Sequence, residues 1–318
     1  MRQVSIHQLS RRGTMKRVSL GVALAALLGT SAWAQSRTFN DDDPRSASEI
    51  AYSFKTIVFP GDTFTQLLGI NKDDKIAGYH GSGAAGHPNK GFVLTLPNYF
   101  DPENFPGSMQ TQVIGINDLQ HTDGFYIDSA GNNHGFLHFD NTFQTVDFPG
   151  TTFNQLLGLN NLDQAAGYYA DALGIDHPYV FYRNGGVFMA LTIPNAAGGG
   201  QATGINDGGS ISGFFIDGGG VTHGFLLAEG ELVQLDFPDA TLTEALGLND
   251  QDEVVGSYTD AAALCHGFVY RKGHFQSVDD PDGIGTTTIN GVNGLGRIVG
   301  FYVDSQGNTD GLVGTPRD

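Results

Sequence analysis

Acidic and imidazole side chains recur along this sequence at one fixed spacing. At one position of a repeated segment, an Asp is followed six residues later by a His in four copies and by another Asp in a fifth. Carboxylate and imidazole groups held close together can bind a divalent metal ion, contact a polar ligand or transfer protons. The pairs are Asp128 with His134, Asp171 with His177, Asp217 with His223, Asp260 with His266, and Asp304 with Asp310.

The repetition of this pair also has a structural explanation. A hydrogen bond between the acid and the imidazole would serve the fold once in every repeat, whereas a catalytic group is not needed several times over. The repetition therefore favours a structural role for most of the pairs. A catalytic or ligand-binding role is expected where the repetition is broken.

The repetition is broken in the first and the last units. Asp304 and Asp310 place two carboxylates where the other units have acid and imidazole, and such a pair would share a proton or hold a cation such as calcium. The first unit lacks the recurring Asp and has His80 and His87 in a longer loop. It also has an aromatic and acidic insert at 98–106, which is either ordinary loop variation or a lid over a ligand.

These side chains belong to a longer repeat whose clearest mark is the tripeptide Gly-(Ile/Leu/Val)-Asn. Around each tripeptide lie an apolar stretch, a polar turn, an alternating stretch that ends near the recurring Asp, and a His-Gly-Phe stretch that leads to Asp-Phe-Pro. Each unit predicts four short strands separated by Gly, Asn and Asp turns. The tripeptides are Gly69-Ile70-Asn71, Gly115-Ile116-Asn117, Gly158-Leu159-Asn160, Gly204-Ile205-Asn206, Gly247-Leu248-Asn249 and Gly291-Val292-Asn293.

Four antiparallel strands per unit, repeated six times, predict an all-β chain folded as a six-bladed β-propeller of four-stranded blades. A solenoid is the alternative architecture. Residues 52–60 have the pattern of a fourth strand that no three others precede, and the last unit, 286–315, supplies only three strands. An N-terminal strand that completes the last blade would close the ring and remove both exposed edges, which favours the propeller.

The units also alternate in sequence. Residues 63–71 are similar to 152–160 and to 241–249, each 89 residues further along the chain. The even-numbered units share a different loop pattern between the recurring Asp and the residue six positions later. We therefore expect three copies of a two-blade unit and approximate threefold symmetry.

The order Gly-Ile-Asn, His-Gly-Phe and Asp-Phe-Pro recurs over nearly all of residues 52–315. In this respect the chain resembles bacterial extracellular proteins of the HAF-repeat family, whose consensus has His-Ala-Phe where this chain has His-Gly-Phe. One unit departs from the pattern with His177-Pro178. The resemblance implies an exported repeat protein and brings no assigned activity and no catalytic residues.

Residues 1–34 have the three parts of a secretory signal peptide: a basic start, an apolar run at 18–28, and small residues before a cleavage site after Ala34. Arg11-Arg12 also fits a twin-arginine export signal, so both export routes stay open. A flexible lead-in is expected at 35–50, followed by one propeller domain at 51–315. We expect the mature chain to be periplasmic or extracellular, without a membrane span.

The charge of the chain limits its partners. It has 16 Lys and Arg against 34 Asp and Glu, and the predicted signal peptide holds several of the basic residues and no acidic one. A surface this negative repels nucleic-acid phosphates and anionic lipids and favours cationic partners. The single cysteine, Cys265, excludes an intramolecular disulfide.

Three functions fit these observations. The first, which we favour, is a monomeric, non-catalytic binding module that uses its acidic loop face to hold a small molecule, a glycan or a protein. The second is an enzyme that needs a divalent cation and acts on a sugar, lactone or polysaccharide in the central channel. It would require one cluster on the axis, with His80, His87, Asp304 and Asp310 as candidates. The third is a surface-layer or adhesion component that self-associates through its faces.

Overall fold

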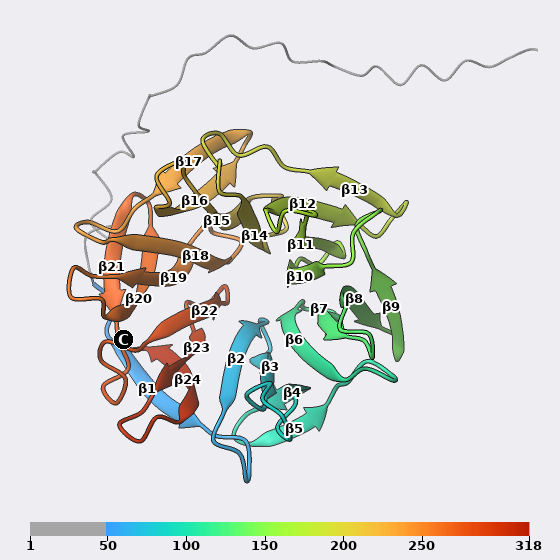
Figure 1. Ribbon diagram of the computed structural model, residues 1–318. Helices are drawn as coiled ribbons and strands as arrows, with labels where there is room; N and C mark the ends of the chain where they lie inside the picture. Colours follow the sequence, from blue (N-terminus) through green and yellow to red (C-terminus); the bar gives the residue numbers. More distant parts are fainter. Residues whose placement is uncertain (1–48, 318) are drawn as a thin grey trace, which may run out of the picture. The chain divides into compact units, whose positions relative to one another are not determined.

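The computed structural model describes residues 49–317 and contains 24 strands and no helix in that range. The strands form six four-stranded antiparallel sheets arranged in a ring (Figure 1). The predicted six-bladed β-propeller is therefore confirmed. The predicted signal peptide, and all but the last two residues of the predicted lead-in, lie outside the described residues.

We number the blades 1 to 6 along the chain and call their strands first to fourth from the centre outward. Blades 1 and 2 consist of β2 (Thr65–Ile70), β3 (Lys75–His80), β4 (Lys90–Thr95), β5 (Tyr99–Pro102), and of β6 (Gln110–Ile116), β7 (Thr122–Ile127), β8 (Asn133–Phe139), β9 (Thr142–Val146). Blades 3 and 4 consist of β10 (Asn154–Leu159), β11 (Gln164–Ala170), β12 (Asp176–Tyr182), β13 (Val187–Ala190), and of β14 (Gly200–Ile205), β15 (Ile211–Ile216), β16 (Thr222–Ala228), β17 (Glu231–Leu235). Blades 5 and 6 consist of β18 (Leu242–Leu248), β19 (Val254–Thr259), β20 (Cys265–Arg271), β21 (His274–Val278), and of β22 (Thr288–Val292), β23 (Ile298–Val303), β24 (Thr309–Pro316), β1 (Tyr52–Ile57).

The ring closes as the sequence predicts. The N-terminal strand β1 pairs with β24 over its whole length, from Tyr52 opposite Pro316 to Ile57 opposite Gly311. One further bond joins the two ends of the described chain, because the Arg317 N–H donates to the Ala51 carbonyl at 2.8 Å. Strand β1 is thus the fourth and outermost strand of blade 6, and it covers the edge of β24 that would otherwise be unpaired. No helix within residues 49–317 has the length and apolar character needed to cross a membrane.

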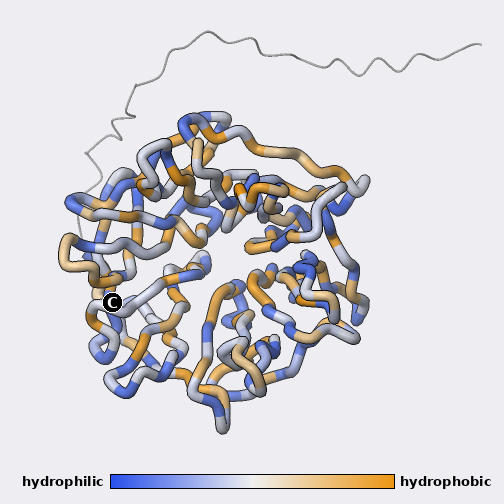
Figure 2. Tube along the Cα trace, in the orientation of Figure 1, coloured by the Kyte–Doolittle hydropathy of each residue, from blue (hydrophilic) through white to orange (hydrophobic). Residues whose placement is uncertain are grey.

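The core lies between neighbouring blades, where the third strands place their aromatic side chains. Phe136, the aromatic residue of His-Gly-Phe in blade 2, is fully buried, as are its counterparts in the other blades. The preceding Gly135 is required by close packing, because a Cβ there would lie 2.6 Å from the Val146 carbonyl oxygen. A side chain at this position of the third strand would therefore clash with the fourth strand. Figure 2 shows hydrophobic residues on the inner strands β2, β6 and β10, around the centre of the ring.

The two faces of the ring differ in the loops that they carry. We call one the turn face, since it holds the turns from first to second strand, such as 71–74, and from third to fourth strand, such as 140–141. We call the other the link face, since it holds the loops from second to third strand, such as 128–132, and the links between blades, such as 147–153. Loop and link meet on this face, where Asn133 forms an isolated bridge with Phe153.

The Asn of each Gly-x-Asn tripeptide joins two blades on the turn face. Its Oδ1 accepts the N–H groups two or four residues ahead, which fixes the turn; Asn117, for instance, accepts from Leu119 and His121 at 3.0 Å. Its Nδ2 donates to the carbonyl of the next Asn in the ring. The donors and acceptors are Asn71 to Asn117, Asn117 to Asn160, Asn160 to Asn206, Asn206 to Asn249, Asn249 to Asn293, and Asn293 to Asn71, at 3.0 to 3.2 Å. Six hydrogen bonds therefore form a closed circle around the channel.

The residue after each Asn forms a second, incomplete circle. The backbone N–H at this position is accepted by the side chain at the same position of the next blade, as for Asp207, which donates to Asp250 Oδ1 at 2.9 Å. The same bond is made by Lys72, Asp118 and Asn161. The circle is interrupted at blade 6, because Gly294 has no side chain to accept the Asp250 N–H.

Filling this gap should stabilise the protein. A Cβ added at Gly294 would meet nothing closer than 3.7 Å, so Gly294→Asn is expected to raise the free energy of unfolding by about 1–2 kcal/mol through a lower unfolded-state entropy and one new hydrogen bond. Urea denaturation measures the change. Gly294→Ala gains the entropy term alone, so equal gains for the two variants would show that the new bond does not form.

Candidate functional site

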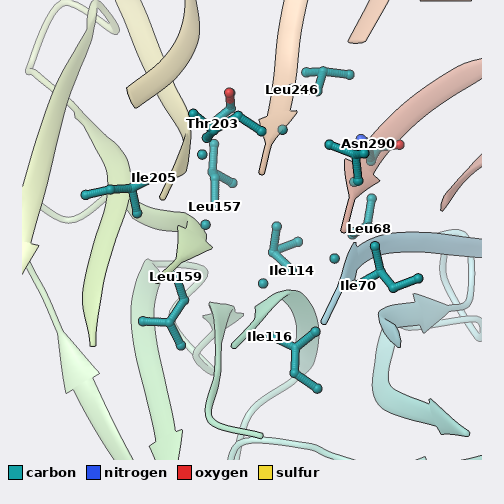
Figure 3. Close-up of a pocket in the computed structure, with 18 residues that line it drawn as sticks. Leu68, Ile70, Ile114, Ile116, Leu157, Leu159, Thr203, Ile205, Leu246 and Asn290 are labelled. Carbon is teal, nitrogen blue, oxygen red and sulfur yellow. The ribbon is translucent and has the colours of Figure 1, made fainter. Parts of the chain in front are cut away.

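The central channel is lined by the first strands of all six blades (Figure 3). A β-bulge in each of these strands turns one residue toward the axis, and this residue precedes the Gly of the tripeptide. The axial residues are Leu68, Ile114, Leu157, Thr203, Leu246 and Asn290. The channel widens to about 100 Å³ at this level and to about 140 Å³ at the Asn circle, which is small beside the ~300 Å³ of an ordinary ligand pocket. Four of the six axial side chains are aliphatic, and the wider level is lined by the polar side chains of the Asn circle and of the residues that follow it.

The predicted Asp and His pairs are brought together on the link face. In blade 3, the His177 Nε2 lies 3.0 Å from Asp171 Oδ2, and the corresponding distances in blades 2, 4 and 5 are 3.3, 3.5 and 3.5 Å. The other oxygen of each Asp accepts two backbone N–H groups of its own loop, as Asp217 does from Gly219 and Val221. Each Asp therefore shapes its loop and also holds the His.

The hydrogen bonds lower the pKa of these carboxyl groups. The pKa of Asp128 falls to about 2, chiefly because the backbone N–H and side-chain amide of Asn132 donate to it. The pKa of Asp171 falls mainly through its bond to His177. For Asp217 and Asp260 the backbone N–H groups of Val221 and Leu264 are the largest cause of the lowered pKa. The recurring acids are thus ionised and paired.

A second carboxylate on three of the histidines was not expected from the sequence. It comes from the Asp of Asp-Phe-Pro, at the end of the fourth strand, or from its counterpart Asp279. The bonds are His134 Nδ1 to Asp147, His223 Nδ1 to Asp236, and His266 Nδ1 to Asp279, at 2.8, 2.8 and 2.7 Å. Burial lowers the pKa of these three imidazoles, but the hydrogen bonds and charges of the two carboxylates outweigh it and raise the pKa. Each of these imidazoles has a short bond at Nδ1 and a second carboxylate 3.3 to 3.5 Å from Nε2, which suits a structural bridge between two acids.

A Phe that precedes the Pro of the link fills the joint between blades; it belongs to Asp-Phe-Pro in some links and to Asn104-Phe105-Pro106 in the link from blade 1 to blade 2. In the link from blade 1 to blade 2, Phe105 stacks on Tyr126 with ring centres 3.7 Å apart, and Phe237 stacks on Tyr258 at 3.6 Å in the link from blade 4 to blade 5. The link from blade 3 to blade 4 has Ile193 at this position, and the link from blade 5 to blade 6 has Asp280. These two joints are the places where the repeated packing changes.

The first unit does not bring its histidines to the axis. His80 bonds Asp62 through Nδ1 at 2.8 Å and stacks on Phe59 at 3.6 Å between ring centres, whereas His87 lies exposed in the loop between β3 and β4. The insert at 98–106 is not a lid. Its first part is the fourth strand β5, and its second part is the link that carries Phe105 into the joint with blade 2.

In the last unit, Asp310 occupies the position that His has in other blades, opposite Tyr302 in the strand register. Burial and the negative charge of Asp304 raise the pKa of Asp310, which is the behaviour of two neighbouring carboxylates. Asp304 itself is held by the side-chain amide and backbone N–H of Asn308. Among residues 49–317 no group of three or more His, Cys, Asp or Glu side chains is arranged to hold a metal ion. A cation at Asp304 and Asp310 would need backbone oxygens or water as further ligands.

The calcium hypothesis for Asp304 and Asp310 makes a specific prediction. A cation that binds only the native state raises the melting temperature, so EDTA should lower the melting temperature of the mature chain and added Ca²⁺ should restore it. Asp310→His installs the imidazole of the other blades and should remove the calcium effect. The hypothesis is wrong if EDTA leaves the wild-type melting temperature unchanged.

No protein-family model matches the sequence, and no curated protein matches it either. Solved structures with the same fold have low sequence identity. A protein described as TolB from Agrobacterium tumefaciens is 11% identical with a TM-score of 0.59, over 85% of this chain and 100% of that chain. A gluconolactonase from Xanthomonas campestris is 10% identical with a TM-score of 0.52, over 84% and 90%. A lectin from Aleuria aurantia, in complex with α-methyl-L-fucoside, is 9% identical with a TM-score of 0.52, over 80% and 93%. At these identities the likeness shows the propeller fold alone.

Proposed function

We propose that this chain is an exported binding module of the HAF-repeat type that holds a basic partner on its link face. The observation that carries the proposal is the distribution of charge between the two faces. Within residues 49–317, Lys90 is the one Lys or Arg on the link face. The other basic residues lie on the turn face or reach toward it: Lys55, Lys72, Lys75, Arg183, Arg271, Lys272, Arg297 and Arg317.

Carboxylates lie on both faces, but on the described part of the link face Lys90 is the one Lys or Arg among them. The carboxylates in the loops and links of the link face, or at the strand ends beside them, are Asp62, Glu103, Asp128, Asp147, Asp171, Asp176, Asp217, Asp236, Asp239, Asp260, Asp279, Asp280, Asp282, Asp304 and Asp310. Three pairs of them each share a histidine bridge whose raised imidazole pKa favours the cationic form, which offsets a small part of this charge when the ring is protonated. On the turn face, in contrast, four acids have a Lys or Arg partner; Asp163 pairs with Arg183 and Asp118 with Lys72, for example. The link face therefore attracts cations and steers them to one side of the ring.

Apolar side chains add contact area on the same face. Ile284 and Leu264, in neighbouring loops at the joint of blades 5 and 6, are 71% and 45% exposed. An acidic surface with exposed apolar side chains fits a protein segment that carries both basic and apolar residues. The similar structures include a lectin and a gluconolactonase, so the same architecture serves binding and catalysis. The carboxylates bonded to His134, His223 and His266 and the narrow channel support the binding role here.

Charge reversal on each face tests the proposal. Asp239→Lys with Asp282→Lys changes two exposed acids of the link face, and Asp73→Lys with Asp140→Lys makes the same change on the turn face. With a fluorescent oligolysine peptide as the probe, we expect the first double variant to bind at least about fivefold more weakly than wild type, and the second to bind nearly as well. Binding should weaken at about 0.5 M salt because surface charges are screened. Equal losses in the two variants would contradict a face-specific role.

A further inference from the structure

An open pocket lies on the link face at blade 4. This pocket has a volume of about 540 Å³, which falls in the range of small-molecule sites. Its polar walls are Asn195, Asp217, His223 and Gln234, and its apolar walls include Ala197 and Phe215. It is separate from the channel, which is lined by the first strands.

The hollow exists because the joint between blades 3 and 4 departs from the repeat. Four other links place a Phe flat on the aromatic ring of the next second strand. This link has Ile193, which packs into the core with Phe215. The chain then turns at Asn195, whose φ is +64°, and continues with small residues. Gly218 faces them, since a Cβ built there would lie 3.8 Å from the Ala197 Cβ. Small side chains on both walls leave the volume that a Phe fills elsewhere.

The polar groups of the pocket are fixed before any ligand binds. Asp236 holds His223 Nδ1 at 2.8 Å and Gln234 Nε2 at 2.7 Å, so both side chains are anchored from one carboxylate. Asp217 is anchored through Oδ1 by two backbone N–H groups. Its Oδ2 is 3.5 Å from His223 Nε2, at the limit of a hydrogen bond, which leaves both atoms available to a closer partner. Such preorganisation lowers the entropy cost of binding.

The combination of groups selects a class of ligand. A carboxylate, an imidazole and two side-chain amides offer donors and acceptors side by side, and hydroxyl groups, which both donate and accept, satisfy them best. Ala197 and Phe215 offer apolar surface for a C–H face. Asp217 and Asp236 disfavour an anion. We propose that the blade 4 pocket binds a neutral sugar, as a monosaccharide or as the terminal residue of a glycan.

One substitution blocks the pocket without touching its polar groups. Gly218 has no positive φ, and a Cβ there would make only an ordinary contact with the Ala197 Cβ at 3.8 Å, so Gly218→Leu places a side chain in the hollow. Ala261 follows Asp260 as Gly218 follows Asp217, so Ala261→Leu makes the matched change in blade 5. Melting curves of both variants report whether the fold is intact, and Gly218→Val serves if the Leu variant is unstable.

The probes are methyl glycosides of glucose, galactose, mannose and fucose, with glucosamine and glucuronate as charged sugars. Binding at about 10 mM sugar is followed by saturation-transfer NMR and then by calorimetry. We expect at least one neutral glycoside to bind wild type and the Ala261→Leu variant equally, and to bind the Gly218→Leu variant at least about tenfold more weakly. The inference is overturned if no neutral glycoside binds, if Gly218→Leu binds as wild type does, or if a charged sugar binds best. Binding of a neutral sugar should be insensitive to salt, which separates this result from the oligolysine test of the link face.

Discussion

A chain that begins at Gly61, and therefore lacks β1, should fail to fold as a closed monomer. Strand β1 buries Tyr52 and Ile57 and covers the outer edge of β24, where Leu312 and Val313 are also buried. Each large apolar side chain contributes about 1.5–3 kcal/mol, so the loss is comparable with the whole stability of an ordinary domain, about 5–15 kcal/mol. We expect loss of the cooperative melting transition, or oligomers in which β24 edges pair.

The matched control is a chain that begins at Glu49, which keeps β1 and removes only residues outside the described structure. Circular dichroism melts and size-exclusion chromatography with light scattering compare the two proteins. A monomer that begins at Gly61 and melts at the temperature of the control would contradict closure by β1.

Replacing Asp123 should stabilise the protein at neutral pH. This side chain is fully buried in blade 2, where it accepts the Gly115 N–H through Oδ1 at 2.7 Å, and its Oδ2 has no hydrogen-bond partner among the described residues. Burial raises the pKa of Asp123 to about 7, although the Gly115 and Gly158 N–H groups act against it. Blade 4 has Ser212 at the same position. Asp123→Ser therefore removes the charge and keeps a polar atom that the fold accommodates.

The sign of the pH dependence follows from the direction of this shift. Because the pKa of Asp123 is higher in the folded than in the unfolded chain, its ionisation costs nothing below about pH 4 and destabilises the fold progressively up to about pH 7. At one pKa unit per about 1.4 kcal/mol, and after loss of part of the hydrogen bonding, Asp123→Ser should gain about 1–3 kcal/mol at about pH 8 and almost nothing at about pH 4. Urea denaturation across this range measures both proteins. A variant less stable than wild type at high pH would show that the backbone hydrogen bonds outweigh the buried charge.

The propeller ring and its closure were predictable from the sequence because both depend on short local patterns that recur along the chain. Six Gly-x-Asn units and an unmatched strand at 52–60 specify six blades and the strand that completes the last of them. The pairing of the recurring Asp with the residue six positions later was also predictable, since an antiparallel loop brings those positions together. Asp147, Asp236 and Asp279 were not connected with the histidines, although the Asp of Asp-Phe-Pro recurs, because only the register of the fourth strand places them there.

The role of the tripeptide Asn shows where sequence reasoning ends. An Asn in a tight turn is expected for its own turn chemistry, but the acceptor of its amide lies in the next blade, 43 to 46 residues away or, across the closure, 222. The blade 4 pocket was hidden for a related reason. The absence of a Phe at Ile193 is visible in the sequence, but the hollow also requires that Ala197 and Gly218 face each other. Segregation of charge likewise depends on which loops share a face.

The two ends of the described chain lie side by side, and this fixes where a tether or another domain would join the propeller. Ala51 and Arg317 are hydrogen-bonded neighbours at the outer edge of blade 6, on the turn face. A tether or fused domain joined at either end would thus leave from one point on the side opposite the acidic loops. Anchored by one end to a surface, the ring can stand with its link face toward the surroundings, and a second module at the other end would stay on the anchored side. Strand β1 therefore closes the ring and also places both attachment points on the turn face.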